Sequence, residues 1–263
     1  MGLAAGRALA LGDRPDGTLA LTWILAEELG AGRRDLQALA RRWVARHSAD
    51  SGDIEPETGA ALTHLSRHDA PPSRAAGRGS DALVRALPVA LAAHHAPGTL
   101  VSATYHIVAL THPEPLVAWA AVAVNVALAR FLQGKRDFVP DVVEALRNNE
   151  VPDELLRVVR RVPLPAALND TAPAVAPGLA VADAEAALRL AYHEPVLDRG
   201  LRMLVGPGVA AAGRAGLAGA LLGARDGVGA IPDGWIVRID AGMLQALAAQ
   251  LVRLDPAAAA AMP

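Results

Sequence analysis

Residues 205–235 read VGPGVAAAGRAGLAGALLGARDGVGAIPDGW. Glycine and alanine dominate this stretch, and its spacing is that of a loop that enters a tightly packed helix. Many enzymes place acidic or phosphate-binding groups at such a point, but here the corresponding side chains are methyl groups and hydrogens. The backbone amides at the helix start, with Gly208 and Arg214 nearby, are able to bind a phosphate or a carboxylate. The alternative, which the density of small residues favours, is close packing against another helix.

Apolar residues recur at helical spacing along most of the chain, and no segment shows the alternation that is typical of a strand. Besides the glycine-rich helix within residues 205–235, the expected helices cover residues 19–32, 35–47, 55–68, 80–94, 112–134, 140–162 (two helices that separate near Pro152), 181–194 and 240–254. Loops rich in proline and glycine are expected at 68–80 and 168–178. No repeat or linker divides the chain, so the sequence predicts one compact all-α domain over residues 1–263.

The composition narrows the possible classes of protein. With 263 residues, 52% of them hydrophobic, and a net charge of −2, the chain can form one large globular core. The absence of cysteine excludes disulfides and thiolate catalysis, and no signal peptide is recognisable, so a cytoplasmic location is expected. The longest apolar run, residues 116–132, is interrupted by Asn125 and Arg130, which predicts a buried helix and no membrane span.

Arginine supplies nearly all of the positive charge, since Lys135 is the only lysine. This bias indicates a GC-rich bacterial genome rather than a surface for nucleic acids. We expect no nucleic-acid partner, and a homo-oligomer is possible.

Four segments of the chain, in this order, resemble the ADP-ribosylglycohydrolase family, which includes the dinitrogenase-reductase-activating glycohydrolases. They are LALGD (9–13) with the helix that ends in LAEEL (25–29), GRGSDALVRALPVAL (77–91), VALTHPEPLVAWAA (108–121) and AGLAGALLGARDGVGAIPDGW (215–235). The resemblance implies a mostly helical domain. Active members of the family hold two magnesium ions between the starts of their first and last helices.

The chain departs from the family pattern at the positions of the metal ligands. The family's first motif, threonine-aspartate-aspartate-threonine, falls on DGTL, residues 16–19. In its second motif, aspartate-x-aspartate-threonine, the two aspartates fall on Ala210 and Ala212 and the threonine falls on Gly213. A long loop that contributes a glutamate in the family is reduced here to LGDRPDGT. The resemblance therefore implies a degenerate member without a binuclear magnesium centre, and we expect no cofactor.

Several polar residues remain where the family has its site. The family's asparagine-glycine pair falls on Ser80 and Asp81, and its arginine is retained as Arg85. Asp81 and Arg85 are spaced to form an intrahelical pair, or else to act as an acid and an anion clamp. His112 is either a buried or capping histidine or a side chain that faces a ligand.

The turn DRPDGT contains Asp13, Asp16 and Thr18, which are either helix-capping groups or functional ones. The candidate catalytic residues are Asp16, Asp81 and His112, and the candidate ligand-binding residues are Asp13, Thr18, Ser80, Arg85, Gly208 and Arg214.

Three classes of function remain open. The first is a pseudoenzyme that binds ADP-ribose, another nucleotide or a protein partner without hydrolysing it. The second is a repurposed, metal-independent enzyme for a small molecule, for example in a biosynthetic pathway, in which Asp16, Asp81 or His112 acts as acid or base. The third is a structural or oligomerising protein.

Overall fold

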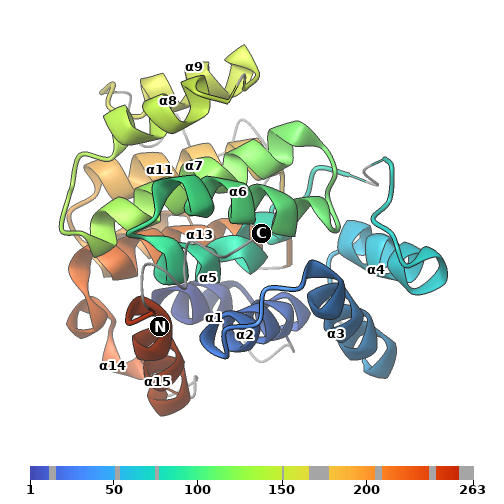
Figure 1. Ribbon diagram of the computed structural model, residues 1–263. Helices are drawn as coiled ribbons and strands as arrows, with labels where there is room; N and C mark the ends of the chain where they lie inside the picture. Colours follow the sequence, from blue (N-terminus) through green and yellow to red (C-terminus); the bar gives the residue numbers. More distant parts are fainter. Residues whose placement is uncertain are drawn as a thin grey trace.

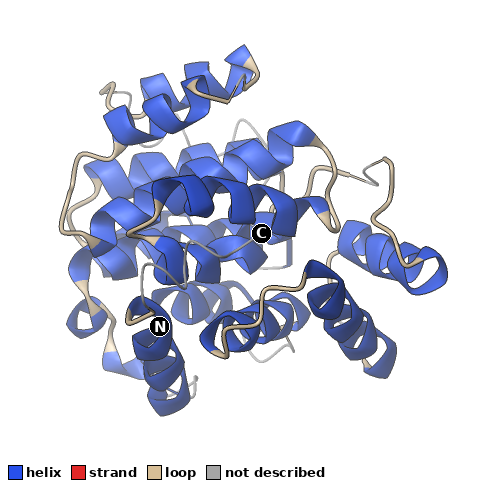
Figure 2. Ribbon diagram, in the orientation of Figure 1, coloured by secondary structure: helices blue, strands red, loops and turns tan. Residues whose placement is uncertain are grey.

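The computed structural model describes residues 1–11, 16–50, 54–74, 77–149, 151–165, 178–204, 209–236 and 241–254. Within these ranges the regular structure is helical, and the single β-bridge joins Gly79 to Leu179 (Figure 2). The prediction of an all-α fold is confirmed.

The bounds of the described helices are α1 (Gly2–Leu11), α2 (Gly17–Gly30), α3 (Leu36–Ala49), α4 (Pro56–His68), α5 (Asp81–Ala93), α6 (Pro97–Ala109), α7 (Pro115–Leu132), α8 (Val139–Arg147), α9 (Asp153–Arg161), α11 (Ala180–His193), α12 (Leu197–Leu204), α13 (Val209–Asp226), the short 3-10 helix η1 (Val228–Ala230), α14 (Asp233–Ile236) and α15 (Ala241–Val252). The longest intervals between consecutive described helices separate α4 from α5 and α9 from α11.

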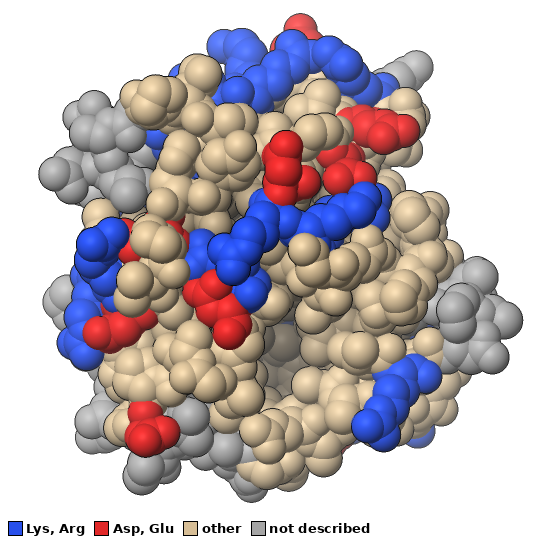
Figure 3. Space-filling view, turned by 90° about the vertical axis from the view of Figure 1, so that its left-hand side faces the viewer, with Lys and Arg blue, Asp and Glu red and all other residues tan. Residues whose placement is uncertain are grey.

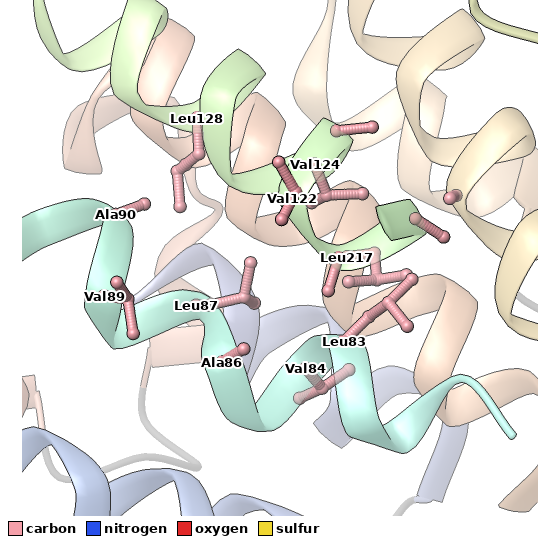
Figure 4. Packing of buried hydrophobic residues seen from close by; sticks show 14 of the residues in the cluster. Leu83, Val84, Ala86, Leu87, Val89, Ala90, Val122, Val124, Leu128 and Leu217 are labelled. Carbon is pink, nitrogen blue, oxygen red and sulfur yellow. The ribbon is translucent and has the colours of Figure 1, made fainter. Parts of the chain in front are cut away.

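Helices α5, α7 and α13 form the centre of the molecule, with α1, α2, α3 and α15 on one side and α8 and α9 on the other (Figure 1). Leucine, valine and alanine side chains fill the space between α5 and α7, and Leu217 of α13 joins them (Figure 4). Burial of these apolar side chains provides the main driving force for the fold. The site described below lies where the starts of α2 and α5 meet α1 and α13.

Helix α7 is the one described helix that is long and apolar enough to cross a membrane, and 78% of it is buried inside the protein. Its Asn125 is fully buried and donates hydrogen bonds of 2.9 Å to the carbonyl of Ala86 and to Thr104 Oγ. Because these bonds satisfy its amide nitrogen, a polar residue can lie in the central helix. The expectation of a buried helix over residues 116–132 is confirmed.

Local signals in the sequence predicted several helix boundaries correctly. Asp35 accepts hydrogen bonds from the amides of Gln37 and Ala38 at the start of α3. Helices α8 and α9 separate at Pro152, and α5 continues through Pro88. The expected loop 168–178 lies almost wholly outside the described residues.

Among the described helices of eight residues or more, α1, α6 and α12 were not predicted. Helix α1 is rich in alanine and glycine, and α6 contains the β-branched run around Val101 and Thr104, so neither has a clear polar face. Contacts with α13 and α7 stabilise these helices, and those contacts cannot be read from a local pattern.

Candidate functional site

Helix α1 lies directly against α13 along a line of glycines. A Cβ atom at Gly6 would overlap the carbonyl oxygen of Ala215, and Gly2 and Gly219 stand in the same relation to each other's carbonyls. The glycines of α13 thus allow α1 to pack closely against it, which is the alternative that the density of small residues favoured. A Cβ at Gly216 would lie 2.9 Å from Cγ of Arg7, so this glycine also makes room for the arginine side chain.

Arg7 joins the first turn of α2 to the first turn of α5. Its Nε and Nη2 donate to the two carboxylate oxygens of Asp16 at 2.5 and 2.8 Å, and its Nη1 donates to Oδ1 of Asp81 at 2.9 Å. The hydroxyl of Thr18 donates to the other oxygen of Asp81. Asp16 also caps α2, because it accepts a hydrogen bond from the amide of Leu19 at 2.9 Å. The capping role expected for the DRPDGT turn is confirmed for Asp16. Asp16 also forms the ion pair with Arg7.

This arrangement is buried, and its two carboxylates against one guanidinium give it a formal excess of one negative charge. Arg7 is 1% exposed, Asp81 4% and Thr18 0%. Burial opposes the charge on Arg7, but attraction to Asp81, with the hydrogen bonds and charge of Asp16, outweighs it and holds the pKa of Arg7 above its ordinary value. Arg7 therefore stays protonated and is a permanent cation at this position.

A second buried arginine, Arg85, lies one turn further along α5. Its Nη1 donates to the hydroxyl of Thr58 at 2.8 Å and its Nη2 to the hydroxyl of Thr111 at 2.5 Å. The predicted intrahelical pair between Asp81 and Arg85 is wrong, because Asp81 turns toward Arg7 instead. Burial lowers the pKa of Arg85 to about 10, against the attraction of Glu55 and Asp81.

His112 and Glu55 face each other beside Arg85. Nδ1 of His112 lies 3.5 Å from Nη2 of Arg85 and 3.1 Å from Thr111 Oγ, so the neutral ring carries its proton on Nε2. This nitrogen is 3.7 Å from Oε2 of Glu55, and neither atom has a hydrogen-bond partner within the described part of the chain. His112 is fully buried, which confirms the expectation that it is a buried histidine.

The two groups have strongly displaced pKa values. Burial, followed by repulsion from Asp81, raises the pKa of Glu55 to about 8. Burial, followed by the positive charge of Arg85, lowers the pKa of His112 to about 3. At neutral pH the carboxyl of Glu55 therefore holds its proton, while the imidazole is neutral and a weak base.

Ser80 connects this cluster to a further ion pair. Nε of Arg214 lies 2.7 Å from Oδ1 of Asp183, and Asp183 also accepts hydrogen bonds from Ser80 and from the amide of Gly178. A Cβ at Gly213 would overlap Oγ of Ser80, so α13 and the start of α5 touch at this point. Arg214, one of the candidate ligand-binding residues, is thus paired with Asp183.

The described residues do not fit the two magnesium ions that active members of the family hold. Among the described residues near the start of α2, the carboxylates of Asp16 and Asp81 are bonded to Arg7. Helix α13 presents Ala212 and Gly213 where the family has an aspartate and a threonine. Within the described residues, no group of three or more histidine, aspartate or glutamate side chains is placed to hold a metal ion. One guanidinium lies where hard divalent cations would need several free carboxylate oxygens.

The structure thus brings most of the predicted site residues into one polar cluster. Asp16, Thr18, Ser80, Asp81, Arg85 and His112 belong to it, and Arg214 joins it through Asp183. Asp13 and Gly208 lie outside the described residues.

Sequence reasoning missed three members of the cluster: Arg7, Glu55 and Asp183. The signal for Arg7 was a single charge in the otherwise apolar GLAAGRALAL. Glu55 and Asp183 each stand at the start of a helix, where acidic residues are common and carry no distinctive signal.

Comparison with known proteins agrees with the fold. The family model described as ADP-ribosylglycohydrolase matches residues 5–260. A solved structure described as an ADP-ribosylglycohydrolase-related protein complex superposes with a TM-score of 0.77 at 24% identity, over 96% of this chain and 95% of that one, which shows a shared fold. No curated protein matches the sequence. Since the match spans nearly the whole chain, the protein belongs to the ADP-ribosylglycohydrolase family.

Proposed function

We propose that this protein is a metal-independent pseudoenzyme of its family, which binds a ligand or partner and does not hydrolyse ADP-ribosyl bonds. The observation that supports this most directly is the guanidinium of Arg7, bonded to both Asp16 and Asp81. Magnesium in a hydrolase acts as a Lewis acid and lowers the pKa of a bound water. A guanidinium has no vacant coordination position and supplies neither effect.

The charges of the cluster also bear on what is bound. Arg7, Arg85 and Arg214 are all engaged with carboxylates or hydroxyls of the protein itself. A pyrophosphate would have to displace these internal partners, whereas a protein partner needs only the outer surface. We therefore favour a protein partner over ADP-ribose or another nucleotide as the ligand.

The test combines hydrolysis, metal content and binding. We expect no release of ADP-ribose from an ADP-ribosylated peptide, with or without magnesium, and no stoichiometric magnesium or manganese by elemental analysis. Titration calorimetry with ADP-ribose should show no magnesium-dependent binding. Magnesium-stimulated release of ADP-ribose would overturn the proposal. Metal-independent binding of ADP-ribose would keep the pseudoenzyme but change its ligand from a protein to a nucleotide.

A second candidate is metal-independent catalysis on a small molecule, with Glu55 as the acid. With a pKa of about 8, the carboxyl of Glu55 is protonated near neutral pH and is suited to donate that proton. Its Oε2 has no hydrogen-bond partner within the described residues. Asp16 and Asp81 are less suited because Arg7 holds both. Any turnover found in a substrate screen should decline as the pH rises through about 8 and be absent in Glu55→Gln. Turnover that Glu55→Gln retains would exclude this candidate.

A further inference from the structure

A separate cavity of about 560 Å³ lies between α6, α7 and α8. Its volume is in the range of small-molecule sites. None of the residues that line it belongs to the polar cluster around Arg7, and all of them are among the described residues. Whatever it binds is therefore independent of the function proposed above.

One wall of this cavity is aromatic. Tyr105 of α6 and Trp119 of α7 both line it, with their ring centroids 5.0 Å apart and their planes tilted by 53°. Both side chains are only half-buried. Aromatic faces bind flat rings and attract cations.

The opposite wall, from α8, carries excess negative charge. Asp141 is neutralised by Arg130 of α7, whose Nη2 lies 3.0 Å from its Oδ1. The carboxylate of Glu144 also lines the cavity, and it has no ion pair within the described part of the chain. The cavity therefore has a net charge of −1 from these three side chains.

A buried histidine adds an acceptor to the lining. His94 is 6% exposed, and its Nδ1 donates to the carbonyl of Leu91 at 2.9 Å, which leaves Nε2 as an acceptor. Burial lowers the pKa of His94, so the ring is neutral at pH 7. Like the free carboxylate, this nitrogen favours a ligand that brings hydrogen-bond donors.

We propose that this cavity binds a small organic amine, with a flat ring against Tyr105 and Trp119 and its ammonium group toward Glu144. The aromatic wall supplies apolar contact area and the unpaired carboxylate supplies the charge preference. An anionic ligand of the same shape is disfavoured by Glu144.

The test uses two indole probes that differ in charge. Titration calorimetry should show that tryptamine binds at least tenfold more tightly than indole-3-acetate. Glu144→Gln should weaken tryptamine binding about fivefold, as should Trp119→Ala, while Trp119→Phe retains most of the affinity. Glu154→Gln, which removes an exposed acid on α9 outside the cavity, is the matched control and should change nothing.

Three results would overturn the proposal. They are no binding of tryptamine, equal affinity for the two probes, or a Glu144→Gln variant that binds like Glu154→Gln. The exposed Glu144 can be changed without disturbing the core, so a folding defect in Trp119→Ala leaves the test intact. Since ADP-ribose is absent from every titration, failure here says nothing about the pseudoenzyme proposal.

Discussion

The cluster around Arg7 and the cavity between α6 and α8 both contain acidic side chains, but Asp16 and Asp81 of the cluster are paired with an arginine and Glu144 of the cavity is not, in the part of the chain that the structure describes. In the cluster, Asp16 and Asp81 are bonded to a guanidinium that is 1% exposed. In the cavity, Glu144 has no ion pair among the described residues and lies beside open space. Within the described residues, two acids near the family's metal positions are thus bonded to Arg7, while an acid beside the cavity between α6 and α8 has no such partner.

The outer surface offers a further contrast with the cluster. On the face shown in Figure 3, acidic and basic side chains lie in mixed groups, and a hollow opens in an uncharged area beside them. Such mixing suits the small net charge of −2.

The largest effect is expected from Arg7→Ala. The change leaves two carboxylates without their shared cation in a buried place, and such a loss costs about 3–5 kcal/mol of stability. Urea unfolding followed by circular dichroism measures it. Arg33→Ala, which removes a largely exposed partner of Glu28, should leave the unfolding midpoint nearly unchanged.

The double variant Arg7→Ala/Asp81→Ala sharpens this test. Removing one carboxylate together with its cation should restore part of the stability lost in Arg7→Ala. If the double variant is less stable than Arg7→Ala, or if Arg7→Ala matches Arg33→Ala, the ion pair is not what holds α1 to α2 and α5.

A smaller loss is expected from Gly219→Ala. The added methyl would overlap the carbonyl oxygen of Gly2 and push α1 away from α13, at a cost of about 1–3 kcal/mol. Thermal unfolding measures this change against Gly98→Ala in α6, where a Cβ meets nothing within 4 Å. The control should be neutral or slightly stabilising, since alanine favours helix over glycine. Equal melting temperatures for the two variants would contradict the close packing.

The smallest effect is a pH dependence of stability that Glu55 produces. Between its ordinary value of 4.5 and about 8, Glu55 binds a proton more tightly in the folded state, so stability falls as the pH rises through this range. His112 acts in the opposite sense between about 3 and 6.5, where the unfolded state binds more protons. The two slopes oppose each other below pH 6.5, and the net decline lies between 6.5 and about 8.

In Glu55→Gln this decline should vanish, because the amide resembles the protonated acid and does not ionise. The slope removed is at most about 1.4 kcal/mol per pH unit, the limit for one proton. Urea midpoints at a series of pH values measure it, with Glu154→Gln as a control that retains the wild-type slope. A variant that keeps the decline would place its cause in another group.

Much of the fold could be predicted from the sequence, because helical periodicity and capping residues are local. Asp35 and Asp16 indicated their helix starts correctly, and the apolar run over 116–132 predicted the buried α7. Membership of most candidate residues in one cluster also followed from the order of the motifs. The pairing within that cluster did not: Asp81 was expected to face Arg85, four residues away, and instead contacts Arg7, 74 residues away in the chain.

The sequence by itself determined that the chain is helical, that it resembles one family and that alanines and glycine stand at that family's metal positions. Only the tertiary structure decided what lies there instead. Arg7 reaches Asp16 and Asp81 because glycines let α1 and α13 approach closely, and this proximity depends on contacts between segments about 200 residues apart. The raised pKa of Glu55 also depends on tertiary structure. Glu55 becomes buried and comes close to Asp81 only when the helices pack together.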